Sequence, residues 1–288
     1  MKKQQQSALA AGKKGFWYRL LRDPKAMAGL IFLVVEIVLV IILPLVQGLD
    51  PDVVYADALG KSPQESGHLL GLTDAYQDVY ARLLYGGRVS LTIGIGSTLI
   101  GIIIGVPVGL IAGYYGGKVD AILMRLAEIF LSFPSLVLML VMVAIFGANI
   151  GILCFLLGFL GWPSAAKLIE SNVRSVAKKE YVEAARVLGK SNLRIVFEDI
   201  MPNVLAPVLV TIPFRVSAGV LSEASLSFLG VGIENSWGKS INYALSSFVM
   251  QKEPWIWVPA SVLLVATIVA INLLGEGIRD AFDPKMRR

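Results

Sequence analysis

Two short strings in the sequence, at 189–191 and 238–240, read Gly-Lys-Ser and match the end of a phosphate-binding loop. A complete P-loop has a further glycine five positions before the one that precedes its lysine, which lets the backbone N–H groups cradle the phosphates. Those positions hold Ala184 and Ile233. Neither string completes the motif, so we predict that the chain does not hydrolyse ATP and is not itself an enzyme.

The residue counts also argue against metal and thiol chemistry. The chain has one histidine, His68, and one cysteine, Cys154. His68 lies in an acidic stretch, where a single imidazole is too little to hold a metal ion. Cys154 lies within an apolar block, and a lone cysteine forms neither a disulfide framework nor a thiolate cluster. We therefore expect no catalytic residue, no metal site and no cofactor in this chain.

Polar residues within one long apolar stretch are the candidates for a binding site. Glu223 lies mid-stretch in the string Ser222-Glu223-Ala224-Ser225. Ionisable residues inside a membrane are functional candidates by default, but Glu223 can either line a path or tie helices together through hydrogen bonds. Arg215 is expected nearer the cytoplasmic half of this apolar stretch. It can pair with Glu223 if both side chains face inward. Our candidates for a translocation path are Glu223, Ser222 and Arg215.

The composition predicts that membrane helices position these residues. The chain has 288 residues, of which 56% are hydrophobic and only 16% are charged, against about a quarter charged in soluble domains. Each apolar block is long enough to cross a bilayer, which takes roughly 20 residues. The six blocks span 27–47, 90–115, 121–146, 150–168, 204–230 and 255–275. We therefore predict an all-α membrane protein with six transmembrane helices, in which 27–288 form one transmembrane domain.

Lysine and arginine residues predict the orientation. They concentrate in the N-terminal tail, in the stretch between the fourth and fifth blocks, and in the C-terminal tail, whereas the loop after the first block is acidic. Cytoplasmic segments carry the excess of basic residues, so both termini and the segment 170–203 are predicted to be cytoplasmic and the loop 48–89 external. This pattern also explains the net charge of +5 without nucleic acid as a partner.

The tail 1–26 contains four apolar residues that fall on one helical face, surrounded by basic residues: Phe16, Trp17, Leu20 and Leu21. This pattern is typical of a short helix lying in the membrane interface, and equally of an ordinary juxtamembrane anchor. The first apolar block lacks a small-residue cleavage site, so we interpret it as a retained helix and not as a signal peptide.

Two further patterns concern helix packing. Small residues recur every fourth position in the second block, which lets a neighbouring backbone approach closely; they are Ser97, Gly101, Gly105, Gly109 and Gly113. Prolines inside the third and fourth blocks are expected to kink their helices; they are Pro134 and Pro163.

The charged segment 179–203 has its own amphipathic pattern. Tyr181, Ala184, Ala185 and Leu188 recur at helical spacing, and Gly189 then interrupts the helix. A second short amphipathic stretch follows before Pro202 leads into the fifth block. We predict two short helices joined at a glycine, which protrude from the membrane and dock against a partner.

Here the sequence resembles the EAA loop of ABC importer permeases. The resemblance rests on Glu183, Ala184, Ala185, Gly189 and Pro202, with departures at Asp199, where an aliphatic residue is usual, and at Met201, where leucine is usual. In that family the loop inserts a coupling helix into a groove on an ATPase subunit, so these five residues are implied to couple the chain to its ATPase.

A second resemblance covers nearly the whole chain. The second permease, or C type, of dipeptide and oligopeptide transporters is similar in the segments 68–94, 113–125, 223–232, 236–241 and 272–284. The outer loop departs from that pattern at Leu72 and at Tyr76-Gln77, and the usual proline-rich insertion before Trp237 is absent.

This resemblance implies a fold, a function and partners. The implied fold is that of a type I ABC importer permease in a bacterial or archaeal cytoplasmic membrane, and the implied function is half of a translocation pathway for peptides. The implied partners are a homologous second permease, an extracellular or periplasmic solute-binding protein, and two ATPase subunits that hold ATP and magnesium.

Other functions remain open from the sequence. Relatives of this type also import nickel, metal–chelator complexes or sugars. A secondary transporter is disfavoured because such proteins often contain inverted repeats, and none is evident in this sequence. The third alternative is a membrane scaffold or receptor without transport activity.

Overall fold

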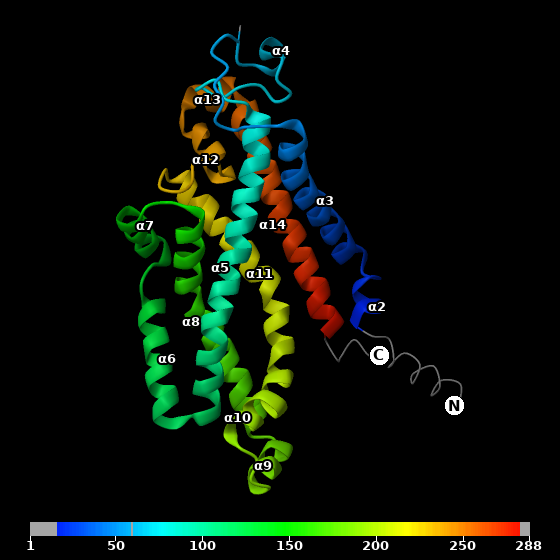
Figure 1. The fold of residues 1–288 in the computed structure, drawn as a ribbon, viewed down its shortest axis with the longest axis vertical. Coiled ribbons are helices and arrows are strands. Elements are labelled where there is room, and N and C mark those ends of the chain that lie inside the picture. Colours follow the sequence, from blue (N-terminus) through cyan, green and yellow to red (C-terminus); the bar gives the residue numbers. More distant parts are fainter. Residues whose placement is uncertain (1–15, 59, 283–288) are drawn as a thin grey trace, which may run out of the picture.

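The computed structural model describes residues 16–58 and 60–282, and these form a predominantly helical structure (Figure 1). The basic residues predicted to orient the two tails lie partly at 1–15 and 283–288, outside the described residues. The β-structure of the described residues consists of two isolated antiparallel bridges in the loop after the first long helix. One joins Val54 to Gln77 and the other joins Leu72 to Asp78.

Within the described residues, five helices are long and apolar enough to cross a membrane. They are α3 (Pro24–Gln47), α5 (Val79–Tyr115), α8 (Ile150–Ala177), the continuous run Asn192–Phe228 that ends with α11 (Met201–Phe228), and α14 (Pro254–Phe282). The predicted third span is divided into α6 (Gly117–Ser132) and α7 (Ser135–Phe146), which meet at an angle of 83°. Pro134 lies at this break, where a kink was predicted, and the pair makes a sixth span if it is counted as one.

Several helices extend beyond the predicted blocks. α5 begins at Val79 and not at 90, so the loop after α3 covers 48–78. α8 continues to Ala177, so the EAA loop begins at 178 and not at 170. The predicted blocks end where charged or loop-forming residues begin, but the folded protein also accommodates charged residues within a helix. Arg82, for example, donates to the Gln77 side chain at 2.7 Å and to the Glu234 carbonyl at 2.8 Å.

The small-residue stripe of α5 packs directly on α8, and the two helices run side by side in Figure 1. A methyl group added to Gly109 would lie 2.6 Å from the Ala166 carbonyl oxygen, and one added to Gly105 would lie 2.6 Å from the Ala165 Cβ. The predicted close approach of a neighbouring backbone is therefore observed, and α8 is the neighbour.

Short helices close the two ends of the bundle. At the end that holds the loop 48–78 lie α4 (Pro63–Ser66), α12 (Trp237–Asn242), η2 (Tyr243–Leu245) and α13 (Ser247–Lys252). The opposite end carries α9 (Glu180–Val187), α10 (Asn192–Arg194) and the π-helix η1 (Ile195–Ile200), which project beyond the long helices (Figure 1). The helix α2 (Phe16–Leu20) packs beside the end of α14, with Leu20 buried against Ala26 and Ala281.

Candidate functional site

The projecting EAA loop consists of two helical pieces joined by a tight turn. Gly189 has φ of +77°, a left-handed conformation that residues with a Cβ rarely adopt. α9 ends at Val187, two residues before this glycine, and the chain then reverses into α10 and η1. The predicted pair of short helices joined at a glycine is present. The second piece is largely a π-helix, a rare conformation that is frequent at functional sites.

Buried apolar residues anchor the EAA loop to the bundle. Val182 from α9 and Ile195 and Ile200 from η1 are fully buried in one core cluster with residues of α5 and α8, including Tyr114 and Val173. Both pieces of the loop therefore share one buried core with the long helices.

The outer face of the EAA loop is apolar and exposed. Val187 and Leu188 are 84% and 85% exposed, and Leu193 is 69% exposed. Glu183 and Ala184 are also exposed, whereas Ala185 packs partly against the core cluster. The projecting loop therefore leaves these three large apolar side chains exposed in this chain.

An ion pair joins the residue that directly follows Gly189 to the end of η1. The Lys190 ammonium lies 2.6 Å from the Asp199 carboxylate and 3.0 Å from that of Glu198. Hydrogen bonds to these two carboxylates, with that of Asp199 the stronger, raise the pKa of Lys190 above its ordinary value. The lysine stays charged and ties the start of the segment after Gly189 to η1.

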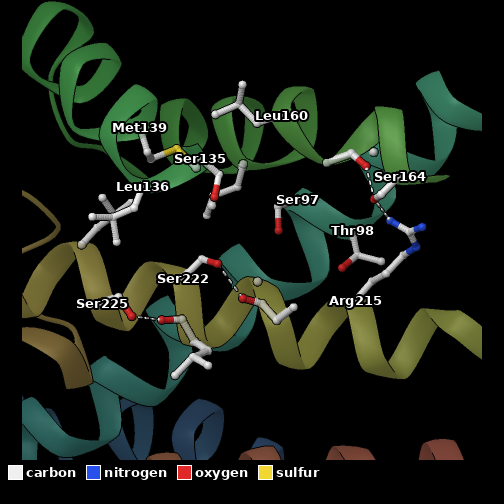
Figure 2. Close-up of a pocket in the computed structure, with 17 residues that line it drawn as sticks. Ser97, Thr98, Ser135, Leu136, Met139, Leu160, Ser164, Arg215, Ser222 and Ser225 are labelled. Atoms are coloured by element: carbon white, nitrogen blue, oxygen red, sulfur yellow. Dashed lines mark hydrogen bonds between the residues drawn. The ribbon is translucent and has the colours of Figure 1, made fainter. Parts of the chain in front are cut away.

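A cavity of about 370 Å³ lies between α5, α7, α8 and α11. Figure 2 shows its polar side chains pointing into the space that these helices enclose. They are Ser97 and Thr98 of α5, Ser135 of α7, Ser164 of α8, and Arg215, Ser222 and Ser225 of α11. The remaining lining is apolar or glycine, as is usual for a small-molecule site with a few placed polar groups.

Arg215 is the charged residue of this cavity wall. Its guanidinium Nη1 donates a hydrogen bond to the Ser164 hydroxyl at 3.0 Å, from α11 across to α8 (Figure 2). The side chain is half-buried. Ser222 also lines the cavity, and its hydroxyl donates to the Ala218 carbonyl at 2.8 Å.

Residues 105–288 match the family described as binding-protein-dependent transport system inner membrane component, and this match covers more than half of the chain. The chain belongs to this permease family. A second family description, the N-terminal TM domain of oligopeptide transport permease C, matches residues 14–63. The resemblance drawn from the EAA loop and the subfamily segments is thereby confirmed.

Curated relatives of this permease match along nearly its full length. The glutathione transport system permease protein GsiD of Pectobacterium atrosepticum is 34% identical, over 94% of this chain and 91% of the relative. The dipeptide transport system permease protein DppC of Bacillus subtilis is 34% identical, over 94% and 85%. The oligopeptide transport system permease protein OppC of Escherichia coli K12 is 36% identical, over 93% and 90%.

A solved structure supports the fold of this permease. A chain of the MetNI methionine ABC transporter, solved in inward-facing conformations, matches it with a TM-score of 0.55 at 22% identity. The match covers 70% of this permease and 97% of that chain. At this identity the likeness shows a shared fold and nothing more.

Glu223 does not lie on the cavity wall of this permease. Its side chain is fully buried, and its two carboxylate oxygens accept hydrogen bonds from Ser90 of α5 at 2.6 Å and from Ser227 at 2.7 Å. It forms no ion pair with Arg215 among the described residues, since that side chain points to Ser164. Of the two interpretations left open by the sequence, this geometry fits the one in which Glu223 ties helices together.

Several polar residues of the cavity were not among the candidates predicted from the sequence. Ser135, Ser164 and Thr98 come from three different helices, and the cavity brings them to the same space as Arg215 and Ser222. Each is a hydroxyl residue inside an apolar block, a signal too common in membrane helices to single out a site. Only the packing of the helices distinguishes these three from other serines and threonines.

Proposed function

We propose that this permease forms half of the translocation pathway of an ABC importer for peptides. The observation that carries the proposal is that one bundle holds both an exposed EAA loop and a serine-lined cavity with a single arginine. Relatives named for dipeptide, oligopeptide and glutathione transport match it along nearly the whole chain, and glutathione is itself a peptide. The same architecture importing nickel or metal–chelator complexes is the alternative.

In this proposal the chain hydrolyses no ATP. Two partner ATPase subunits bind ATP and magnesium, and the EAA loop docks on one of them through Glu183, Ala184, Ala185, Gly189 and the segment that ends at Pro202. The exposed apolar side chains of Val187, Leu188 and Leu193 supply the contact. Their burial in an ATPase groove gives a hydrophobic contribution of about 25 cal/mol per Å².

The proposed topology has six spans, with α6 and α7 as one broken span, in a bacterial or archaeal cytoplasmic membrane. The termini and the EAA loop are cytoplasmic, and the loop 48–78 faces a solute-binding protein outside. In support, the EAA loop and the loop 48–78 lie at opposite ends of the bundle (Figure 1).

A homologous second permease completes the pathway. Alternating access needs two halves that move against each other around a central site, and a single EAA loop docks a single ATPase. The subfamily resemblance favours an unlike partner over a second copy of this chain.

Reconstitution in liposomes tests this function. The complete set of two permeases, two ATPases and the binding protein should take up a tripeptide and hydrolyse ATP faster when the peptide is present. Omission of the partner permease should abolish both activities. Full activity from this permease without the other would show that it forms a homodimeric pore, and uptake of nickel in place of peptide would favour the alternative substrate.

A further inference from the structure

We propose that the guanidinium of Arg215 binds the C-terminal carboxylate of a peptide inside the cavity between α5, α7, α8 and α11. This role rests on the proposed function and adds to it the group that recognises the substrate in this half of the pathway. Three features of the cavity carry it: its charge, the direction of its hydroxyl hydrogen bonds, and the spacing of its polar groups along α11.

The cavity carries a positive charge without a carboxylate to balance it. The residues that line it include one arginine and no aspartate or glutamate. Within the described residues Arg215 forms no ion pair, and its hydrogen bond to Ser164 uses one of the five N–H donors of a guanidinium. The remaining donors suit a planar acceptor with two oxygens, such as a carboxylate. An unpaired charge among membrane helices is costly, and a bound anion would remove that cost.

The hydroxyl groups of the cavity are oriented as acceptors. Thr98 donates its hydroxyl hydrogen to the Gly94 carbonyl at 2.8 Å, and Ser225 donates to the Leu221 carbonyl at 2.8 Å. Ser222 bonds its own helix in the same way. A hydroxyl that donates to its own helix still has oxygen lone pairs for an incoming N–H group. The wall therefore offers acceptors for peptide N–H groups and a cation for the carboxylate.

The spacing along α11 fits a short peptide. Arg215 precedes Ser222 by two helical turns, so their positions are about 10 Å apart along the helix axis at 1.5 Å per residue. An extended chain covers roughly 3.3–3.6 Å per residue, so a tripeptide spans this distance. Since Arg215 lies nearer than Ser222 to the EAA-loop end of α11, the peptide would enter with its carboxylate leading.

The test compares a free carboxylate with its neutral amide. Three complexes are reconstituted: one without substitution, one with Arg215→Gln and one with Arg215→Lys. The uptake of trialanine and of trialanine amide is measured for each complex. Each uptake rate is divided by the fraction of binding protein that is occupied by the same peptide. We expect Arg215→Gln to slow trialanine uptake about tenfold, the scale of a lost charged hydrogen bond. Uptake of the amide should change less than about twofold, and Arg215→Lys should be intermediate for trialanine.

The matched control is Arg88→Gln. Arg88 lies on α5 outside the cavity lining, and its guanidinium donates to the Ile41 carbonyl. This variant should keep the preference for trialanine over the amide. A second measurement avoids the binding protein: equilibrium dialysis of trialanine against the purified complex should show a dissociation constant about tenfold higher for Arg215→Gln and unchanged for Arg88→Gln.

Each outcome decides a different point. Equal losses for trialanine and its amide would overturn the carboxylate role and would fit an anionic lipid headgroup or a structural contact at Arg215. Unchanged trialanine uptake and binding in Arg215→Gln would overturn it as well. If the complex without substitution takes up neither peptide, the proposed function is refuted. The Arg215 variants then have no transport activity with which to be compared.

Discussion

The Lys190 ammonium and the Asp199 carboxylate lie 2.6 Å apart and join the residue that follows Gly189 to η1. Asp199 occupies a position at which EAA loops usually carry an aliphatic residue. An aspartate is tolerated here because the lysine neutralises it at the surface of the loop. The departure from the family pattern therefore has a local compensation nine residues earlier in the chain.

Lys190→Met should weaken coupling more than Asp199→Leu. The first substitution leaves the carboxylates of Glu198 and Asp199 close together without a cation, whereas the second leaves Lys190 paired with Glu198. Copurification of the ATPase subunits measures the effect, and we expect a loss of severalfold for Lys190→Met. If both variants copurified equal amounts of the ATPase subunits, the ion pair would not stabilise the conformation of the loop.

The contribution of Lys190 to this pair should not change when the pH varies around neutrality. The pKa of Lys190 is raised above 10.5, so its contribution is complete below 10.5 and is lost only as the pH rises through the higher folded value.

Gly189→Glu should abolish uptake while the subunit still inserts into the membrane. The glycine has φ of +77°, so a residue with a side chain strains the turn and places a bulky charge on the docking surface. The control is Gly67→Glu, since Gly67 has φ of +72° in the loop at the opposite end and, like Gly189, has open space around it. ATPase copurification should fall for Gly189→Glu alone. Normal copurification and uptake in that variant would contradict the coupling role.

Gly109→Ala should destabilise the bundle, and Gly161→Ala should not. A Cβ on Gly109 would meet the Ala166 carbonyl at 2.6 Å, whereas one on Gly161 would meet nothing within 4 Å. Overpacking costs typically about 1–3 kcal/mol, enough to lower the melting temperature of the purified permease by several degrees. Equal melting temperatures for the two variants would mean that α5 and α8 can move apart to accommodate the added methyl group without a loss of stability.

Glu253→Gln should stabilise, at neutral pH, the end of the bundle that holds the loop 48–78. Burial raises the pKa of the Glu253 carboxyl, and a hydrogen bond with Asp74 and that residue's charge raise it further, whereas Lys61 lowers it. A carboxyl with a raised folded pKa reduces stability as the pH rises through that value, and the loss disappears below the ordinary value of 4.5. Hydrogen exchange in 60–78 should therefore be slower in Glu253→Gln at pH 7, with the difference vanishing near pH 4. A difference independent of pH would assign the effect to packing.

Cysteine labelling should place the EAA loop inside the cell. On a Cys154→Ser background, Lys178→Cys should react with a membrane-impermeant maleimide only after the cells are opened, whereas Asp57→Cys should react in intact cells. Both positions lie in loops at opposite ends of the bundle. Labelling of Lys178→Cys in intact cells would overturn the proposed topology.

Sequence alone determined the features that depend on local composition. Bilayer-length apolar runs specify helices wherever they insert, because a backbone in lipid must satisfy its own hydrogen bonds. Gly189 specified the turn of the EAA loop since few other residues adopt its conformation. The stripe on α5 likewise predicted a close helix neighbour, although not which helix it would be.

The tertiary structure decided which way the polar side chains of those helices face. Glu223 and Ser222 are adjacent in sequence, yet one is fully buried against Ser90 and the other lines the cavity. The sequence allowed Arg215 to pair with Glu223 if both side chains faced inward, but the Arg215 hydrogen bond goes to Ser164, 51 residues away on α8. Neighbouring residues on a helix point about 100° apart, so a residue's role depends on which helix packs against each face. That arrangement arises from contacts distant in sequence, which local patterns do not encode.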